Sequence, residues 1–205
     1  MASASRPTIL LISISDHGFL EEMYASLFDQ LSQSTTLKSA KAASDAIQAL
    51  NEGNLKAVII TDEGLTARAN KKVLDKVKTY VQNGGLAIVG LHFNSFTTGD
   101  AFDRFFAAFE LPWKRGDYCR TSFNLNPECA LPPTAAAASF PDWLNMKAVH
   151  VAHVRADEKI FIGVSSWSEE AGVAATQVGS GCLAYVGDVN AEAESNKVIL
   201  ALCGL

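Results

Sequence analysis

The feature that most constrains the fold of this chain is the alternation of short apolar runs with amphipathic segments in its first half. Apolar runs occupy residues 8–13, 55–61 and 86–91. Such unbroken runs are typical of strands buried on both faces of a parallel sheet. Between them, apolar residues recur at helical spacing, most clearly over 19–31 and 73–81. We therefore predict that these three strands are parallel and adjacent in one sheet.

The second half of the chain favours strands over helices. Apolar runs there predict strands at 148–154, 159–164, 173–178 and 182–186, the last two flanking a Gly179-Ser180-Gly181 hairpin turn. The proline-rich stretch 111–141 predicts one strand, 121–125, within an excursion that packs over the sheet. Together these elements predict one α/β domain spanning 1–205, a three-layer flavodoxin-like sandwich with a mostly parallel sheet and a C-terminal β-hairpin.

Composition narrows the classes of partner. The chain has 205 residues, a net charge of −5 and no run of Lys and Arg, which disfavours nucleic acid and anionic membranes. Its apolar runs are too short to span a bilayer. The cysteines, Cys119, Cys129, Cys182 and Cys203, form no Cys-x-x-Cys pair and are expected to be reduced thiols. We expect a soluble cytoplasmic protein without a cofactor or metal, and leave a homo-oligomer open.

The most distinctive local feature is the turn that follows the third apolar run. Residues 86–91 lead into a sharp turn, and a helix is predicted over 99–109. A nucleophile elbow places its reactive side chain on such a strand-to-helix turn. Here the turn carries His92, with no Ser or Cys. His92 is either functional, as a general acid or base or as a hydrogen-bond donor to a ligand, or a structural histidine bonded to the backbone.

Polar side chains follow the apolar strands at four points in the sequence. They are Asp16 and His17, then Thr61, then Asn94 and Ser95 beside His92, and finally Asp188. Because ligands of open α/β sheets bind outside the carboxyl ends of the strands, these residues predict a pocket. Segment 113–120 supplies Trp113, Arg115 and Arg120 as a cover, although a strand edge is an equal alternative. Asp16 or Asp188 would orient His92, although either carboxylate also suits a helix cap.

Two further patterns near the centre of the chain carry weaker signals. His150 and His153 differ by an odd step on a predicted strand, so they point to opposite faces and cannot share a metal. Cys119 lies beside Arg120, which favours a thiolate, but no Cys-His pattern follows it. A nucleophilic role for Cys119 is therefore the minor alternative.

A family resemblance rests on about twenty of these residues. Gly90-Leu91-His92 resembles the Gly-Leu-His motif of the trehalose-utilisation (ThuA-like) family, within the class I glutamine amidotransferase-like superfamily. The segment 179–188 resembles its terminal strand-hairpin-strand. Class I amidotransferases carry Gly-x-Cys-x-Gly at the elbow and a His and a Glu near the last strands. In this chain His92 and Asn94 replace the Cys and the second Gly, and Asp188-Val189-Asn190 replaces the His-x-Glu.

The resemblance implies an amidotransferase-like protein without the nucleophilic Cys. It would bind a small polar ligand at the elbow, and the family's link to sugar metabolism points to a sugar derivative. As an enzyme it would be a hydrolase or sugar-modifying enzyme, not a glutaminase, with His92 and Asp188 as catalytic residues. The alternative is an inactive binding or oligomeric scaffold. A carboxylate within reach of His92 favours the enzyme, and a buried His92 bonded to backbone favours the scaffold.

Overall fold

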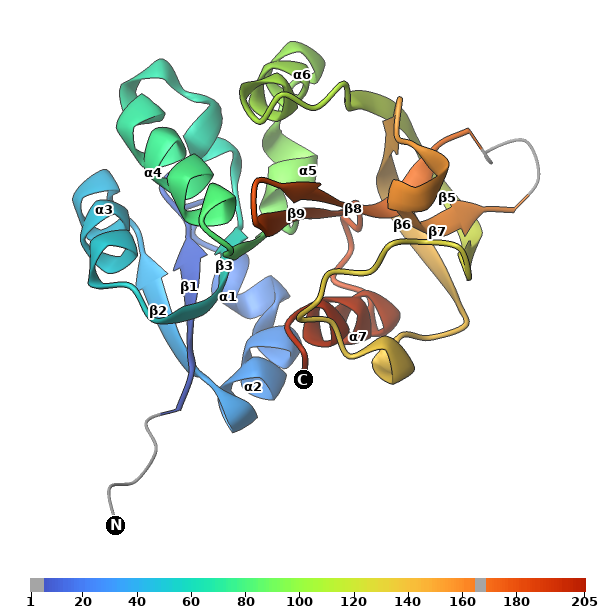
Figure 1. Ribbon diagram of the computed structural model, residues 1–205, viewed down its shortest axis with the longest axis horizontal. Helices are drawn as coiled ribbons and strands as arrows, with labels where there is room; N and C mark the ends of the chain where they lie inside the picture. Colours follow the sequence, from blue (N-terminus) through green and yellow to red (C-terminus); the bar gives the residue numbers. More distant parts are fainter. Residues whose placement is uncertain (1–5, 165–168) are drawn as a thin grey trace.

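A nine-stranded sheet runs through the centre of the computed structural model, which describes residues 6–164 and 169–205 (Figure 1). The strands lie in the order β2-β1-β3-β4-β9-β8-β6-β5-β7, and β7 also pairs with β8. They are β1 (Thr8–Ile12), β2 (Thr36–Ala40), β3 (Leu55–Ile60), β4 (Leu86–Val89), β5 (Lys114–Leu125), β6 (Trp143–Ala152), β7 (Lys159–Gly163), β8 (Ala171–Val178) and β9 (Gly181–Val186).

The N-terminal half of the sheet is parallel. β1 pairs with β2 and β3, β3 with β4, and β4 with β9, all in the parallel sense. The predicted adjacency of the three apolar strands is thus confirmed. Successive side chains of a strand point to opposite faces, so Ile9 and Leu11 join one core while Leu10 and Ile12 join the other.

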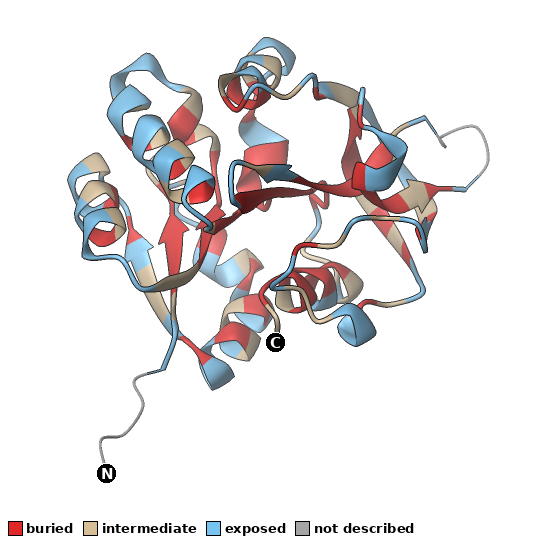
Figure 2. Cartoon of the chain, viewed as in Figure 1, coloured by how far each residue is buried: buried red, intermediate tan, exposed pale blue. Residues whose placement is uncertain are grey.

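Helices cover both faces of this parallel half (Figure 1). α3, α4 and α6 pack against the core that contains Leu10, while α2 and α7 pack against the core that contains Ile9. Their outward faces are exposed, whereas the central strands are buried (Figure 2). The helices are α1 (Leu20–Met23), α2 (Ala25–Ser34), α3 (Ala43–Glu52), α4 (Lys71–Gln82), α5 (His92–Phe96), α6 (Gly99–Ala108) and α7 (Ala193–Leu202). Short 3₁₀ turns occupy Glu63–Thr66, Arg68–Asn70, Ala137–Ser139 and Ala156–Glu158.

The other half of the sheet corrects the predicted fold class. β5 pairs antiparallel with β6 and β7, and β8 pairs antiparallel with β6, β7 and β9. Because β7 contacts both β5 and β8, the strands β5, β6, β8 and β7 close into an antiparallel barrel. A mostly parallel flavodoxin-like sandwich is therefore wrong. The predicted hairpin at Gly179-Ser180 is present between β8 and β9.

The error comes from the stretch predicted as an excursion. Much of it is the twelve-residue strand β5, whose register on β6 shifts between Arg115 and Tyr118. Such a bulge breaks the two-residue alternation by which strands are recognised. Only the part from Thr121 onward keeps an alternation of polar and apolar residues, with Phe123 and Leu125 as the apolar ones. Among the described residues, no helix has the length and apolarity needed to cross a membrane.

Candidate functional site

The turn after β4 is tight and strained. A Cβ on Gly90 would lie 2.9 Å from the carbonyl oxygen of Val186, so a side chain does not fit at this position. The next residue, Leu91, has φ 58° and ψ −128°, a backbone conformation that residues other than glycine rarely adopt. The strained residue is thus Leu91, one position before His92. Leu91 is buried and apolar, so this turn presents no nucleophile.

His92 begins α5 and is 1% exposed. Its ring lies among the rings of Phe19, Tyr24 and Phe96, with centroid distances of 4.5, 5.5 and 5.5 Å. Neither ring nitrogen has a hydrogen-bond partner among the described residues. Burial, and then the charge of His17, lower the pKa of His92 below its usual range. His92 is therefore a neutral imidazole with no hydrogen bond to a carboxylate or to a backbone group in the described part of the chain, so the structural alternative of a backbone-bonded ring is not met.

His92 is not alone in this region in having buried polar atoms without a described hydrogen-bond partner. In the described part of the chain, Tyr24 Oη, Asn94 Oδ1 and Thr97 Oγ1 are also buried without a partner. Burial raises the pKa of the Tyr24 phenol, and the charge of Asp188 raises it further, so the hydroxyl stays protonated. Buried polar groups almost always have a hydrogen-bond partner, so a concentration of unpartnered atoms calls for an explanation.

A histidine–carboxylate pair lies at the mouth of this aromatic cluster. His17 Nε2 lies 2.8 Å from Glu63 Oε2, and both side chains are about a quarter exposed. Burial raises the pKa of Glu63, but the hydrogen bond from His17 and the charge of that ring outweigh it and leave the pKa lowered. The His17 ring stacks on Phe96 and meets His92 edge-on at 5.7 Å. His17 and His92, which follow two different strands, thus lie side by side.

The loops that carry this pair are joined by one buried carboxylate. Asp62 accepts hydrogen bonds from the backbone N–H groups of Ser15, Asp16 and Gly64 at 2.9, 3.1 and 2.9 Å. These bonds tie the segment after β1 to the segment after β3. Burial raises the pKa of Asp62 in spite of the three donors. Asp62 is therefore a positioning residue for His17 and Glu63.

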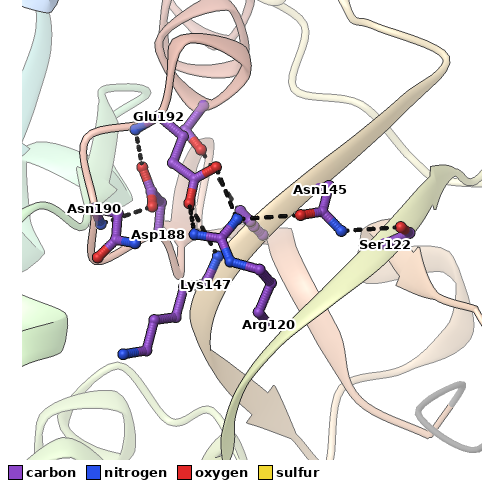
Figure 3. Close-up of polar contacts among 9 residues, drawn as sticks. Arg120, Ser122, Asn145, Lys147, Asp188, Asn190 and Glu192 are labelled. Atoms are coloured by element: carbon purple, nitrogen blue, oxygen red, sulfur yellow. Dashed lines mark hydrogen bonds and ion pairs between the residues drawn. The ribbon is translucent and has the colours of Figure 1, made fainter.

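Asp188 serves the start of α7 (Figure 3). Its two carboxylate oxygens accept from the backbone N–H groups of Asn190 and Glu192, at 2.9 and 2.8 Å. Burial raises the pKa of Asp188 above its usual range. Glu192 in turn accepts from Arg120 at 2.6 Å, so this network fastens α7 to β5. No hydrogen bond joins Asp188 to His92 among the described residues.

The remaining predicted residues do not converge on one pocket. Thr61 donates to the carbonyl of Ile12, and Asp16 lies 3.7 Å from Lys41. Asn94 donates to the carbonyls of Val186 and Asp188, Ser95 is exposed, and Arg115 donates to the carbonyl of Thr97. Trp113 is fully buried against Phe106 and donates to Glu158. Segment 113–120 is therefore core and strand, and its Arg115 side chain reaches the residues after the elbow, where it donates to the carbonyls of Asn94 and Thr97.

A hollow of about 370 Å³ adjoins the loop after β1. Its floor is apolar, with Leu11, Leu20, Phe28 and Leu37, and Asp16, Glu21 and Lys41 stand at its rim. No group of three or more His, Cys, Asp or Glu side chains in the described residues is arranged to hold a metal. Glu63, Tyr24 and Phe96 were not predicted to be site residues, although Glu63 follows the same strand end as Thr61. Glu63 followed a strand end and was the one with a usable signal.

Cys182 and Cys203 are buried free thiols, as predicted, and burial raises the pKa of each to about 12.

No protein-family model matches the chain, and no curated protein matches its sequence. Solved structures match its fold. A protein from Parabacteroides merdae described as thua-like covers 97% of this chain and 88% of its own length, at 11% identity and a TM-score of 0.61. The N-terminal domain of mmIFT52 covers 95% and 97%, at 16% identity and a TM-score of 0.60.

Sugar-acting enzymes also match. A β-galactosidase from Rahnella sp. R3 covers 97% of this chain at 14% identity and a TM-score of 0.60, but only 31% of its own length. The chain thus spans about a third of the β-galactosidases it matches. At identities this low the likeness concerns the fold, and the chain has the fold of the ThuA-like proteins.

Proposed function

We propose that this chain binds a small polar ligand, a sugar or sugar derivative, beside His17 and Glu63 at the carboxyl ends of β1, β3 and β4. One observation carries the proposal. His92 and Tyr24 present buried polar atoms without partners in the described residues, next to the partly exposed His17–Glu63 pair. A ligand that carries hydroxyl groups, or an ordered water, would supply the missing hydrogen-bond partners of these atoms.

The rings around the pair support a sugar in particular. Phe19 is 44% exposed and Phe96 39% exposed, and both contact the His17 ring. Exposed aromatic rings beside hydrogen-bonding groups suit a ligand with an apolar face and polar edges. The matched β-galactosidases and an exo-β-1,4-mannosidase act on sugars, although this chain spans only about a third of each.

We further propose that the chain is an atypical class I glutamine amidotransferase-like protein that does not hydrolyse glutamine. Leu91 at the strained position and His92 after it supply no thiol. If the ligand is transformed, His17 is the better acid or base, because it is partly exposed and Glu63 fixes its tautomer. His92 then acts by hydrogen bonding to the ligand as a neutral ring.

Thermal-shift and calorimetric titrations with monosaccharides, sugar acids and amino acids test the proposal. Ligand binding raises the melting temperature of the native protein. We expect a sugar or sugar acid to do so, and His17→Gln to abolish the shift. His153→Gln, a change of the same type at an exposed residue directly after β6, is the matched control. A shift that survives His17→Gln would place the ligand elsewhere.

The second candidate function is an inactive scaffold that has no site for a small-molecule ligand. It is favoured by the apolar Leu91 at the strained turn and by the lack of a carboxylate bonded to His92 in the described residues. Absence of any ligand-dependent shift across the three compound classes would select it.

A further inference from the structure

Three side chains of the antiparallel barrel form a relay outside the elbow site. Cys119 Sγ lies 3.7 Å from His150 Nε2, and His150 Nδ1 lies 3.1 Å from Glu170 Oε2. His150 is fully buried, Cys119 is partly exposed, and the Glu170 side chain is 19% exposed. The imidazole thus stands between a thiol that solvent reaches and a carboxylate. The three do not converge on a common point, which distinguishes the arrangement from a metal site.

Strand pairing brings these residues together from three parts of the sequence. Cys119 on β5 pairs with Ala148 on β6. His150 lies two residues further along β6, so it is the diagonal neighbour of Cys119 on the same face. Glu170 precedes β8, whose first residue, Ala171, pairs with Val151 of β6. Only this register aligns the thiol, the ring and the carboxylate.

The protonation of the relay follows from its partners. Because a carboxylate only accepts hydrogen bonds, Nδ1 of His150 carries the hydrogen and Nε2 is the acceptor that faces the thiol. Burial lowers the pKa of His150, while Glu170 and Asp117 act against it. Burial, Asp117 and Glu170 raise the pKa of the Cys119 thiol. The neighbouring Arg120 is paired with Glu192. The resting state is therefore a neutral thiol beside a neutral imidazole.

We propose that Cys119 is a nucleophile activated by His150 as general base, with Glu170 as the positioning residue, and that it reacts with uncharged carbon electrophiles such as the acyl group of an ester. A nucleophile within reach of a base that a third group orients is the arrangement used for covalent catalysis. Asp117 and Glu170 beside the thiol disfavour anionic substrates. This site is separate from the elbow, and its test is independent of ligand binding there.

The reaction balances with the substrate and water alone. Sγ attacks the carbonyl carbon, and its proton passes to Nε2 of His150. The C–O bond of the ester breaks, and the departing alcohol takes that proton, leaving a thioester on Cys119. Water then attacks the thioester and gives a proton to His150, which returns it to Sγ as the acid is released. No oxidant or further reactant is consumed.

Alkylation of the native wild-type protein with iodoacetamide, followed by peptide mass spectrometry, gives the first test. Cys129 is the internal control, because it is also partly exposed, burial also raises its pKa, and none of its described contacts is a histidine. We expect Cys119 to react about tenfold or more faster than Cys129 at pH 7. The Cys119 rate should level off once His150 is neutral, whereas the Cys129 rate should keep rising with pH. Iodoacetate should react more slowly than iodoacetamide at Cys119.

Glu170→Gln tests the relay without emptying the buried histidine site. It keeps the size of the side chain and a hydrogen-bond acceptor, and it removes the charge. We expect a severalfold slower Cys119 reaction and a pH profile that approaches that of Cys129. With p-nitrophenyl acetate, the wild type should release about one equivalent of p-nitrophenolate in a burst and carry acetyl on Cys119, and Cys119→Ala should show no burst. Equal reactivity of Cys119 and Cys129 across pH 6–9, or an unchanged profile in Glu170→Gln, would overturn the proposal.

Discussion

The ring of His17 stacks on the ring of Phe96, with centroids 3.7 Å apart and an interplanar angle of 14°. Stacking fixes the ring plane, and the bond to Glu63 fixes its rotation within that plane. His17 is thereby held by α5 on one side and by the segment after β3 on the other. A partly exposed histidine with so little freedom is suited to present a hydrogen bond in a constant direction.

Two substitutions of His92 distinguish the effect of its ring nitrogens on stability from the effect of its volume. His92→Phe keeps a ring among Phe19, Tyr24 and Phe96 and removes two unpartnered nitrogens, so we expect an unchanged or higher melting temperature and loss of ligand binding. His92→Ala leaves a cavity and should lower the free energy of unfolding by about 2–4 kcal/mol. Urea denaturation measures the stability of both variants, and calorimetric titration measures the loss of ligand binding in His92→Phe. A clear destabilisation in His92→Phe would show that the nitrogens do have partners.

The His17–Glu63 pair predicts a stability change on the acid side. The folded-state pKa of Glu63 lies below its ordinary value of 4.5, so the unfolded chain binds the proton first as pH falls. The contribution of Glu63 is therefore complete above about pH 5 and is lost as pH falls through the folded pKa. We expect the urea midpoint of the wild type to decline more between pH 6 and about 3.5 than that of Glu63→Gln. Parallel declines would contradict this assignment.

Asp188 and Arg120 belong to one network but should differ in energetic weight. Asp188→Ala removes a buried carboxylate that accepts two backbone hydrogen bonds, and should lower the free energy of unfolding by about 2 kcal/mol. Arg120→Ala breaks an ion pair whose arginine is 47% exposed, and should cost less than about 1 kcal/mol. Chemical denaturation of the two variants compares these costs. A larger loss for Arg120→Ala would mean that Asp188 is not what anchors the start of α7.

The buried thiols should be inert in the native state. Cys182 and Cys203 are 7% and 0% exposed, and burial raises the pKa of each to about 12. At pH 7.5 almost no thiolate is present and reagents have no access. Mass spectrometry after iodoacetamide should find both unmodified in the native protein and modified in urea. Rapid native labelling of either would show that its helix or strand opens.

Glutamine should not be hydrolysed. The strained turn offers Leu91 and His92, and a neutral imidazole does not replace a thiolate in thioester chemistry. Ammonia release from L-glutamine should equal the buffer blank. Release above the blank that Cys119→Ala removes would instead assign the activity to the barrel relay.

The parallel half of the fold was predictable because each of its strands is buried on both faces. Ile59 and Ile88, for example, lie in unbroken apolar runs that no helix pattern explains. β5 gave no such signal, since Phe123 is its one buried residue and a bulge interrupts its alternation. Closure of the barrel depends on the long-range pairing of β7 with β5, which leaves no local pattern in the sequence.

Only the part of the site that lies at the ends of the parallel strands was predictable. The rule that ligands bind at strand ends placed His17 near His92, because it needs only the order of parallel strands. It did not place Tyr24 or Phe96, which arrive from helices. The relay of Cys119 and His150 was beyond reach, because it depends on the register between β5 and β6.

Closure of the barrel also limits how copies of this chain can associate. Although β7 turns back onto β8, β2 at the other end of the strand order pairs only with β1, so its outer margin is unpaired among the described strands. Backbone donors and acceptors are available there for a strand of another molecule. Lys38 lies on this margin and is bonded to Glu52 at 2.6 Å. A charged lysine on this margin discourages growth of the sheet into filaments through β2.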